Sequence, residues 1–132
     1  MDPLFLTNTD VLKIHDEQIQ FYGGSAGLRD AGLLDSAIAT PMATFDGQYL
    51  HEGLYEMAGA YLFHLTQNHP FIDANKRTGA NAAMTFLYIN GLKLTCSQDE
   101  LVNTTLAVAS GVLGKKDLAI FFEKNTCPVL ST

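Results

Sequence analysis

One stretch of this chain reads His69-Pro70-Phe71-Ile72-Asp73-Ala74-Asn75-Lys76-Arg77-Thr78, and an apolar, helix-like run follows it directly. The stretch combines a histidine, a carboxylate, a small-residue turn and two adjacent cations. Free backbone N–H groups and the positive end of a helix dipole bind phosphate at the start of a helix. Transfer of a phosphoryl or nucleotidyl group also needs a metal and a group that accepts the proton of the attacking hydroxyl. We interpret the stretch as a phosphate site at a helix start, with a proton acceptor upstream.

Two side chains before the helix start have the chemistry for group transfer. Asp73 offers a hard oxygen ligand, and Mg²⁺ in proteins takes one or two carboxylates together with phosphates and water. Histidines titrate near neutral pH, so His69 can accept the proton of a hydroxyl under cellular conditions. Phe71, the apolar residue between them, is expected to anchor the loop in the core.

The residues at the helix start have the chemistry for binding an anion. The Ala74-Asn75 turn lets backbone N–H groups point at a ligand. Lys76 and Arg77 place positive charge where it is locally unfavourable, by about 0.3–1 kcal/mol, unless an anion is bound there. Asn81 lies four residues after Arg77, on the same helix face, so the two side chains can hold one ligand together.

Each residue of this cluster also has a structural interpretation. Asp73 or Asn75 can be a helix cap, which is the common role of such residues. Lys76 and Arg77 can form a solvated face, and His69 can be satisfied by the backbone of its loop. Their joint occurrence within residues 69–77, in a chain with eight lysines and arginines in total, favours the functional interpretation.

Composition limits the classes of protein that this chain can belong to. Its 132 residues suit one domain, residues 1–132, and 47% hydrophobic residues suffice for a core. The formal net charge of −6 disfavours general nucleic-acid binding but allows a mononucleotide held by a local basic cluster. Cys96 and Cys127 lack metal spacing and are expected as reduced thiols. Without an apolar run of membrane-spanning length or a signal-type N-terminus, we expect a cytoplasmic protein that does not enter membranes.

Apolar periodicity and capping residues predict an all-α fold, a compact bundle of about six helices. A possible small β-hairpin flap lies in residues 42–52, where Asp46-Gly47 is a typical hairpin turn. Apolar residues at 82–89 cover nearly all sides of the fourth helix, which is therefore expected to be central and buried. The helices are expected at residues 8–21, from the Asp30 cap to Pro41, about 54–68, 75–90, about 101–109 and around 118–122.

The remaining histidines have no metal-ligand spacing. We expect His64 to pack in the core and His15 to be an inward or boundary residue of the first helix. His51 falls in the possible flap, where a substrate contact stays open. Gly-rich phosphate loops, nucleophile elbows and dinucleotide-binding glycine patterns are absent from the sequence.

The quoted stretch resembles the signature of the Fic/Doc superfamily, whose Fic form reads H-P-F-x-[D/E]-G-N-G-R-x-x-R. Lys76 replaces the second glycine of that form, and Ala80 replaces its second arginine. Both departures are similar to the Doc branch, the death-on-curing toxins, with H-x-F-x-D-A-N-K-R. Further Doc-like segments are Ile14-His15, Tyr22-Gly23-Gly24, Gly27-Leu28-Arg29-Asp30, Leu33 to Ile38 and Asn90-Gly91.

The resemblance implies a Fic fold and the toxin of a toxin–antitoxin pair. A Doc-type toxin transfers the γ-phosphate of ATP to a hydroxyl of a target protein of the elongation factor Tu type, which arrests translation. His69 would then be the base, and Asp73 would hold Mg²⁺. Residues 74–77 would bind the phosphates, and Asn81 matches a further position associated with the Doc site.

Three other functions are weighed against this one. Fic enzymes commonly transfer AMP instead, although Lys76 and Ala80 argue against AMP transfer here. A catalytically silent module that only binds its antitoxin needs neither His69 nor Asp73. An RNA-cleaving toxin fits poorly with the acidic charge. Residues 48–53 are the nearest match to the inhibitory helix motif of Fic enzymes and lack its leading hydroxyl residue, so control by a separate antitoxin is expected.

Overall fold

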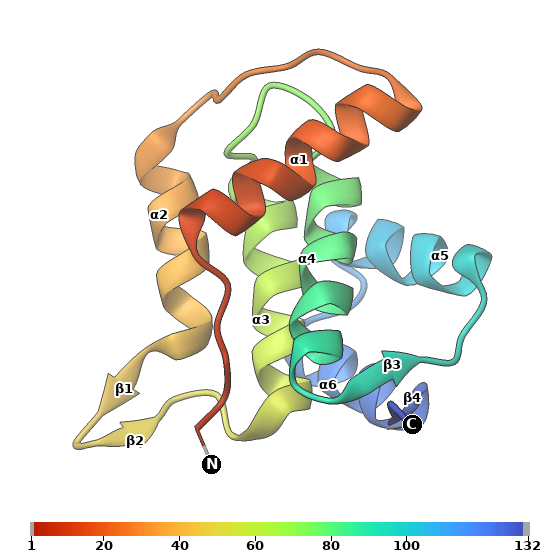
Figure 1. The fold of residues 1–132 in the computed structure, drawn as a ribbon. Coiled ribbons are helices and arrows are strands. Elements are labelled where there is room, and N and C mark those ends of the chain that lie inside the picture. Colours follow the sequence, from red (N-terminus) through yellow and green to blue (C-terminus); the bar gives the residue numbers. More distant parts are fainter. Residues whose placement is uncertain (1, 131–132) are drawn as a thin grey trace.

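The computed structural model describes residues 2–130; Met1 and residues 131–132, which belong to the expected domain 1–132, lie outside it. The expected all-α bundle is confirmed, and Figure 1 shows its arrangement. No helix within residues 2–130 has the length and apolar character needed to cross a membrane. The helices are α1 (Asn8–Tyr22), α2 (Ala31–Ala39), the short 3₁₀ helix η1 (Thr40–Met42), α3 (Gly53–Asn68), α4 (Asn75–Ile89), α5 (Gln98–Ala109) and α6 (Lys115–Lys124).

Helices α3 and α4 lie side by side at the centre of the bundle (Figure 1). α2, α5 and α6 also pack against α3, and α1 packs against α4. Gly79 lets the two central helices approach closely, because a Cβ atom there would lie 2.9 Å from Oγ1 of Thr66 on α3. The loop between α3 and α4 therefore joins two helices that pack closely against each other at the centre of the fold.

Capping residues fix the starts of α1, α2 and α5, and α5 begins at Gln98, earlier than the expected residue 101. Thr7 and Asp10 form a reciprocal capping box at α1, and Ser97 and Glu100 form another at α5. Asp30 caps α2 by accepting the backbone N–H of Leu33. These bonds satisfy N–H groups that have no partner inside the helix.

The expectation that α4 is buried on nearly all sides was wrong. Phe86 and Leu87 are fully buried, but Met84 is 37% and Ile89 40% exposed. The apolar residues of α4 therefore form a broad stripe towards α3 and the core, and the opposite side meets solvent. Composition alone does not separate these two sides, because Met84 and Ile89 are as apolar as the buried residues.

The expected hairpin is present as strands β1 (Thr44–Phe45) and β2 (Gln48–Tyr49). Asp46 and Gly47 both have positive φ, 52° and 76°, as the tight turn of a two-residue hairpin requires.

A second two-stranded sheet corrects the expectation of at most one small β element. Strand β3 (Leu92–Leu94) pairs antiparallel with β4 (Thr126–Pro128), near the C-terminus. Each strand has three residues, too few for an alternating pattern, and two helices separate them in the sequence. Tertiary packing rather than local sequence therefore determines this sheet.

A lysine lies between two histidines where α6 meets α3. Nζ of Lys115 is 3.1 Å from Nε2 of both His51 and His64. Burial and the neighbouring ammonium lower the pKa of His64 to about 4, and the same causes lower the pKa of His51. His64 is only half-buried, and its ring nitrogen lies beside the Lys115 ammonium. It therefore differs from the packed core histidine expected from sequence.

We expect stability to fall as the pH is lowered from about 6.5 to about 4. The folded state favours neutral His64, so unfolding takes up a proton throughout the interval between its ordinary pKa of 6.5 and its folded pKa of about 4. Above about pH 6.5, the stability that neutral His64 contributes to the fold is fully present. Melting temperatures across the interval, compared with those of His64→Gln, measure the effect. An equal slope in the variant would contradict this assignment.

Candidate active site

The loop of residues 69–74 joins α3 to α4 and carries the candidate reactive groups. Two of its residues, neither of them glycine, adopt left-handed backbone conformations: His69 at φ 49° and Ala74 at φ 65°. Such a conformation costs about 1–2 kcal/mol for an L-residue, so the surrounding structure must hold it in place. His69 lies at the exposed end of α3, and Ala74 is the N-cap residue of α4.

The side chain of Asn75 closes the loop on itself. Its Oδ1 accepts the backbone N–H of Phe71 at 2.9 Å, and its Nδ2 donates to the carbonyl of Phe71 at 3.0 Å. Both residues are buried. This amide is therefore committed to the loop, and only the backbone N–H of Asn75 is available for the phosphate contact expected from sequence.

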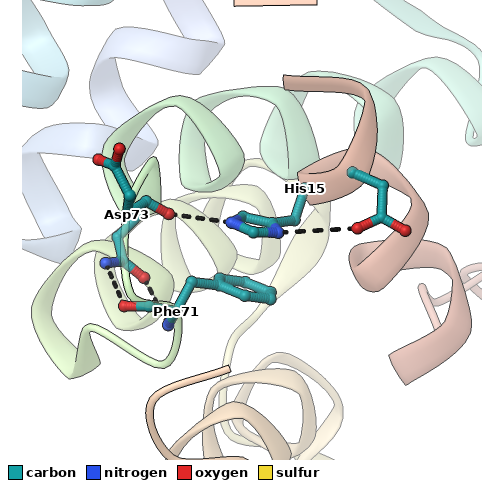
Figure 2. Close-up of polar contacts among 5 residues, drawn as sticks. His15, Phe71 and Asp73 are labelled. Carbon is teal, nitrogen blue, oxygen red and sulfur yellow. Dashed lines mark hydrogen bonds and ion pairs between the residues drawn. The ribbon is translucent and has the colours of Figure 1, made fainter. Parts of the chain in front are cut away.

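His15 of α1 packs against the loop and donates a hydrogen bond to it (Figure 2). Its imidazole stacks on the ring of Phe71 with the centroids 3.8 Å apart and the planes 5° apart. Nε2 donates to the backbone carbonyl of Asp73 at 2.9 Å, which identifies the ring nitrogen that carries a proton. His15 is 2% exposed, in agreement with its expected inward position, but its contact with the site was not foreseen.

The carboxylate of Asp73 is exposed and fixed by backbone N–H groups. Oδ2 accepts from Ser25 at 3.0 Å and Oδ1 from Ala74 at 2.8 Å. These two hydrogen bonds, and the nearby Arg77, hold the pKa of Asp73 below its usual range. Asp73 is thus a charged oxygen ligand at neutral pH, with lone pairs still free.

This donor set suits Mg²⁺ rather than a metal held by protein alone. Within residues 2–130, no three or more His, Cys, Asp or Glu side chains converge as metal ligands. Mg²⁺ is commonly bound by one or two carboxylates, with phosphates and water completing its octahedron. Asp73 fits that description.

The start of α4 has the properties of an anion site. No side chain caps it, and the first N–H groups of a helix have no partner within the helix. Lys76, in the first turn, is exposed to solvent. The positive end of the helix dipole and this cation therefore act at the same place.

Arg77 spans the gap between α4 and the end of α1. Nη1 donates to the carbonyl of Gln18 at 3.2 Å, and Nη2 donates to that of Gly23 at 3.0 Å. Gly24 lies between this guanidinium and Asp73: a Cβ atom there would be 2.6 Å from Oδ2 of Asp73 and 3.2 Å from Nη2 of Arg77. The sequence pointed to Gly24 only as part of the Doc-like segment Tyr22-Gly23-Gly24, because glycine gives no sign of a close contact elsewhere in the fold.

A groove of about 110 Å³ between α4 and α5 brings Lys76, Arg77 and Asn81 together. Nδ2 of Asn81 donates to the carbonyl of Arg77, and Leu101 is one of several apolar residues on the α5 side. Among residues 2–130, His69 is not part of the groove lining. Three of the five expected phosphate ligands therefore share one groove, whereas Ala74 and Asn75 are outside its lining and His69 lies on the adjoining loop.

Comparison with known proteins identifies the family of this chain. The model of the Fic/DOC family matches residues 5–87, more than half of the chain. The chain belongs to the Fic/DOC family. Toxin Doc of Mycolicibacterium smegmatis is 46% identical over 78 residues, which cover 59% of this chain and 60% of that protein. Protein kinase doc of Escherichia phage P1 is 33% identical over 110 residues, 83% of this chain and 86% of that protein.

The Doc branch of the Fic/DOC family accommodates the two departures from the Fic signature. Lys76 is the exposed residue of the first turn, and Ala80 is buried one turn later on α4. An arginine at the position of Ala80 would have to leave the core. The names of both relatives and these two residues place the chain in the Doc branch.

We predict that Asn75→Ala destabilises the fold by about 2–4 kcal/mol, because it leaves two buried backbone groups of Phe71 without partners. Asn81→Ala is the matched control on the same helix and should cost less than about 1 kcal/mol, since it removes one bond to a carbonyl within the helix. Urea unfolding of the three proteins measures both. Equal losses in the two variants would mean that the loop does not depend on Asn75.

Proposed function

We propose that this chain is a Doc-type toxin that transfers the γ-phosphate of ATP to a hydroxyl of a target protein. The observation that carries the proposal is the start of α4, which no side chain caps and whose first turn contains Lys76 and Arg77. The charged carboxylate of Asp73 lies on the adjoining loop. The relatives named a toxin and a protein kinase support this class of activity. The proposed target is a protein of the elongation factor Tu type, whose modification arrests translation.

In the proposed reaction, the oxygen of the target hydroxyl forms a bond to the γ-phosphorus of ATP. The bond from this phosphorus to the β–γ bridging oxygen breaks, and ADP leaves with that electron pair. His69 accepts the hydroxyl proton as the new bond forms. The N–H groups at the start of α4, with Lys76 and Arg77, bind the phosphates and orient them for attack. Mg²⁺ bound by Asp73 would neutralise phosphate charge.

Lys76 is the residue that favours transfer of phosphate over transfer of AMP. A glycine in this position lets a phosphate approach the backbone closely, whereas a lysine fills that space and adds a charge for a terminal phosphate. The nucleotide can then bind in the reversed sense, with its γ-phosphorus beside His69. AMP transfer is the second candidate, and the missing arginine at Ala80 weighs against it.

The proposed regulator is a separate antitoxin. Residues 48–53, the nearest match to the inhibitory motif of Fic enzymes, form strand β2, a bend and the start of α3 instead of a helix of their own. The groove between α4 and α5 lies beside the proposed site, where a short antitoxin segment could be held. With a net charge of −6, the chain is not proposed to bind nucleic acid directly.

We predict that His69→Ala lowers phosphate transfer by at least ~100-fold, because the base that accepts the hydroxyl proton is lost. The purified chain is incubated with Mg²⁺, cell extract and ATP labelled separately at the α- and γ-phosphates. Label from the γ-position should appear on a protein of the extract, and label from the α-position should not.

Lys93→Ala, which removes an exposed cation on β3 far from the loop in sequence, serves as the control and should transfer as the wild type does. Label from the α-position on the target would contradict the kinase assignment in favour of AMP transfer. Full transfer by His69→Ala would show that the imidazole is not the base.

A further inference from the structure

A segment of the α1–α2 connection, residues 27–30, lies against the loop between α3 and α4, and we call it the strap. Figure 1 shows this connection passing over the loop at one end of the bundle. The strap is held by backbone contacts: Ile72 N–H to Gly27 O at 3.1 Å, Arg29 N–H to Pro70 O at 2.8 Å, Asp30 N–H to Pro70 O at 3.0 Å, and an antiparallel bridge between Leu28 and Phe71.

The side chain of Arg29 reaches from the strap to the end of α3. Its Nε donates to the carbonyl of His69 at 2.6 Å, and its Nη2 donates to the carbonyl of Asn68 at 2.7 Å. A cation is favourable at the C-terminus of a helix, where the dipole is negative. Since Arg29 forms no ion pair within residues 2–130, backbone carbonyls are the partners of its guanidinium.

The end of α3 lacks one backbone donor that helix ends of this kind commonly have. His69 has the left-handed conformation that commonly terminates a helix. In such an ending, the N–H of the next residue usually donates back to a carbonyl of the last turn. Here that residue is Pro70, which has no N–H. Arg29 supplies donors to carbonyls at this helix end.

We propose that Arg29 is a positioning residue for His69. The inference rests on the proposed function, in which His69 accepts the hydroxyl proton. By holding the carbonyls of Asn68 and His69, the guanidinium fixes the peptide planes on both sides of the His69 Cα and thus the direction of its Cβ. The imidazole is thereby directed by the strap, while the strap itself stays attached through its backbone contacts when the Arg29 side chain is removed.

The test compares Arg29→Ala and Arg29→Lys with the wild-type chain in transfer from γ-labelled ATP. For Arg29→Ala we expect kcat to fall by about 100-fold, the usual consequence of a misplaced catalytic group. The KM for ATP should change by less than about 2-fold, because Arg29 touches none of the expected phosphate ligands. Arg29→Lys keeps the charge and should recover part of kcat. Lys116→Ala, an exposed cation on α6, is the matched control.

A second measurement is independent of activity. In nitrogen-15 spectra, the imidazole signals of His69 should shift or broaden in Arg29→Ala and stay unchanged in Lys116→Ala. Unchanged His69 signals in Arg29→Ala, or an unchanged kcat in an active chain, would overturn the positioning role. A wild-type chain that transfers no phosphate would overturn the proposed function, and the spectra would still decide the role of Arg29. Should Arg29→Ala fail to fold, Arg29→Lys carries both measurements.

Discussion

The bidentate contact between the Asn75 amide and the backbone of Phe71 is the interaction on which the site depends. It fixes both polar backbone groups of a residue whose ring is buried against His15. His69 lies two residues before Phe71 and Asp73 two residues after it. The short loop therefore has little freedom once its middle residue is held at the backbone and at the side chain. The strain of two left-handed residues is tolerated because this anchor is buried.

Support for the loop comes from a part of the chain about fifty residues away in sequence. α1 contributes His15, and the α1–α2 connection contributes the N–H of Ser25 to Asp73 and the guanidinium of Arg29 to the end of α3. Residues 69–78 thus carry the proposed chemistry, whereas α1 and the α1–α2 connection determine the geometry of these residues. This division is physically reasonable, since a loop that must leave its reactive groups exposed cannot be stabilised by its own burial.

Sequence predicted the parts of the structure that local chemistry determines. The capping boxes and the Asp46-Gly47 turn are satisfied by bonds within a few residues, so they can be read from spacing. The β3–β4 sheet and the solvent-facing side of α4 depend on packing between distant segments. Within the site, the residue types at 69–77 were evident. The roles of His15 and Arg29 were not, because a stacked imidazole and a guanidinium on backbone carbonyls leave no local pattern.

The central claim is that the phosphates of ATP bind where α4 begins. A nitrogen-15-labelled chain titrated with Mg²⁺ and a non-hydrolysable ATP analogue tests it most directly. Saturable shifts are expected, and they should be largest at the backbone amides of residues 74–77 and the side-chain amide of Asn81. Saturable shifts centred instead on the His51–His64–Lys115 cluster, or a spectrum that the nucleotide leaves unchanged, would contradict it.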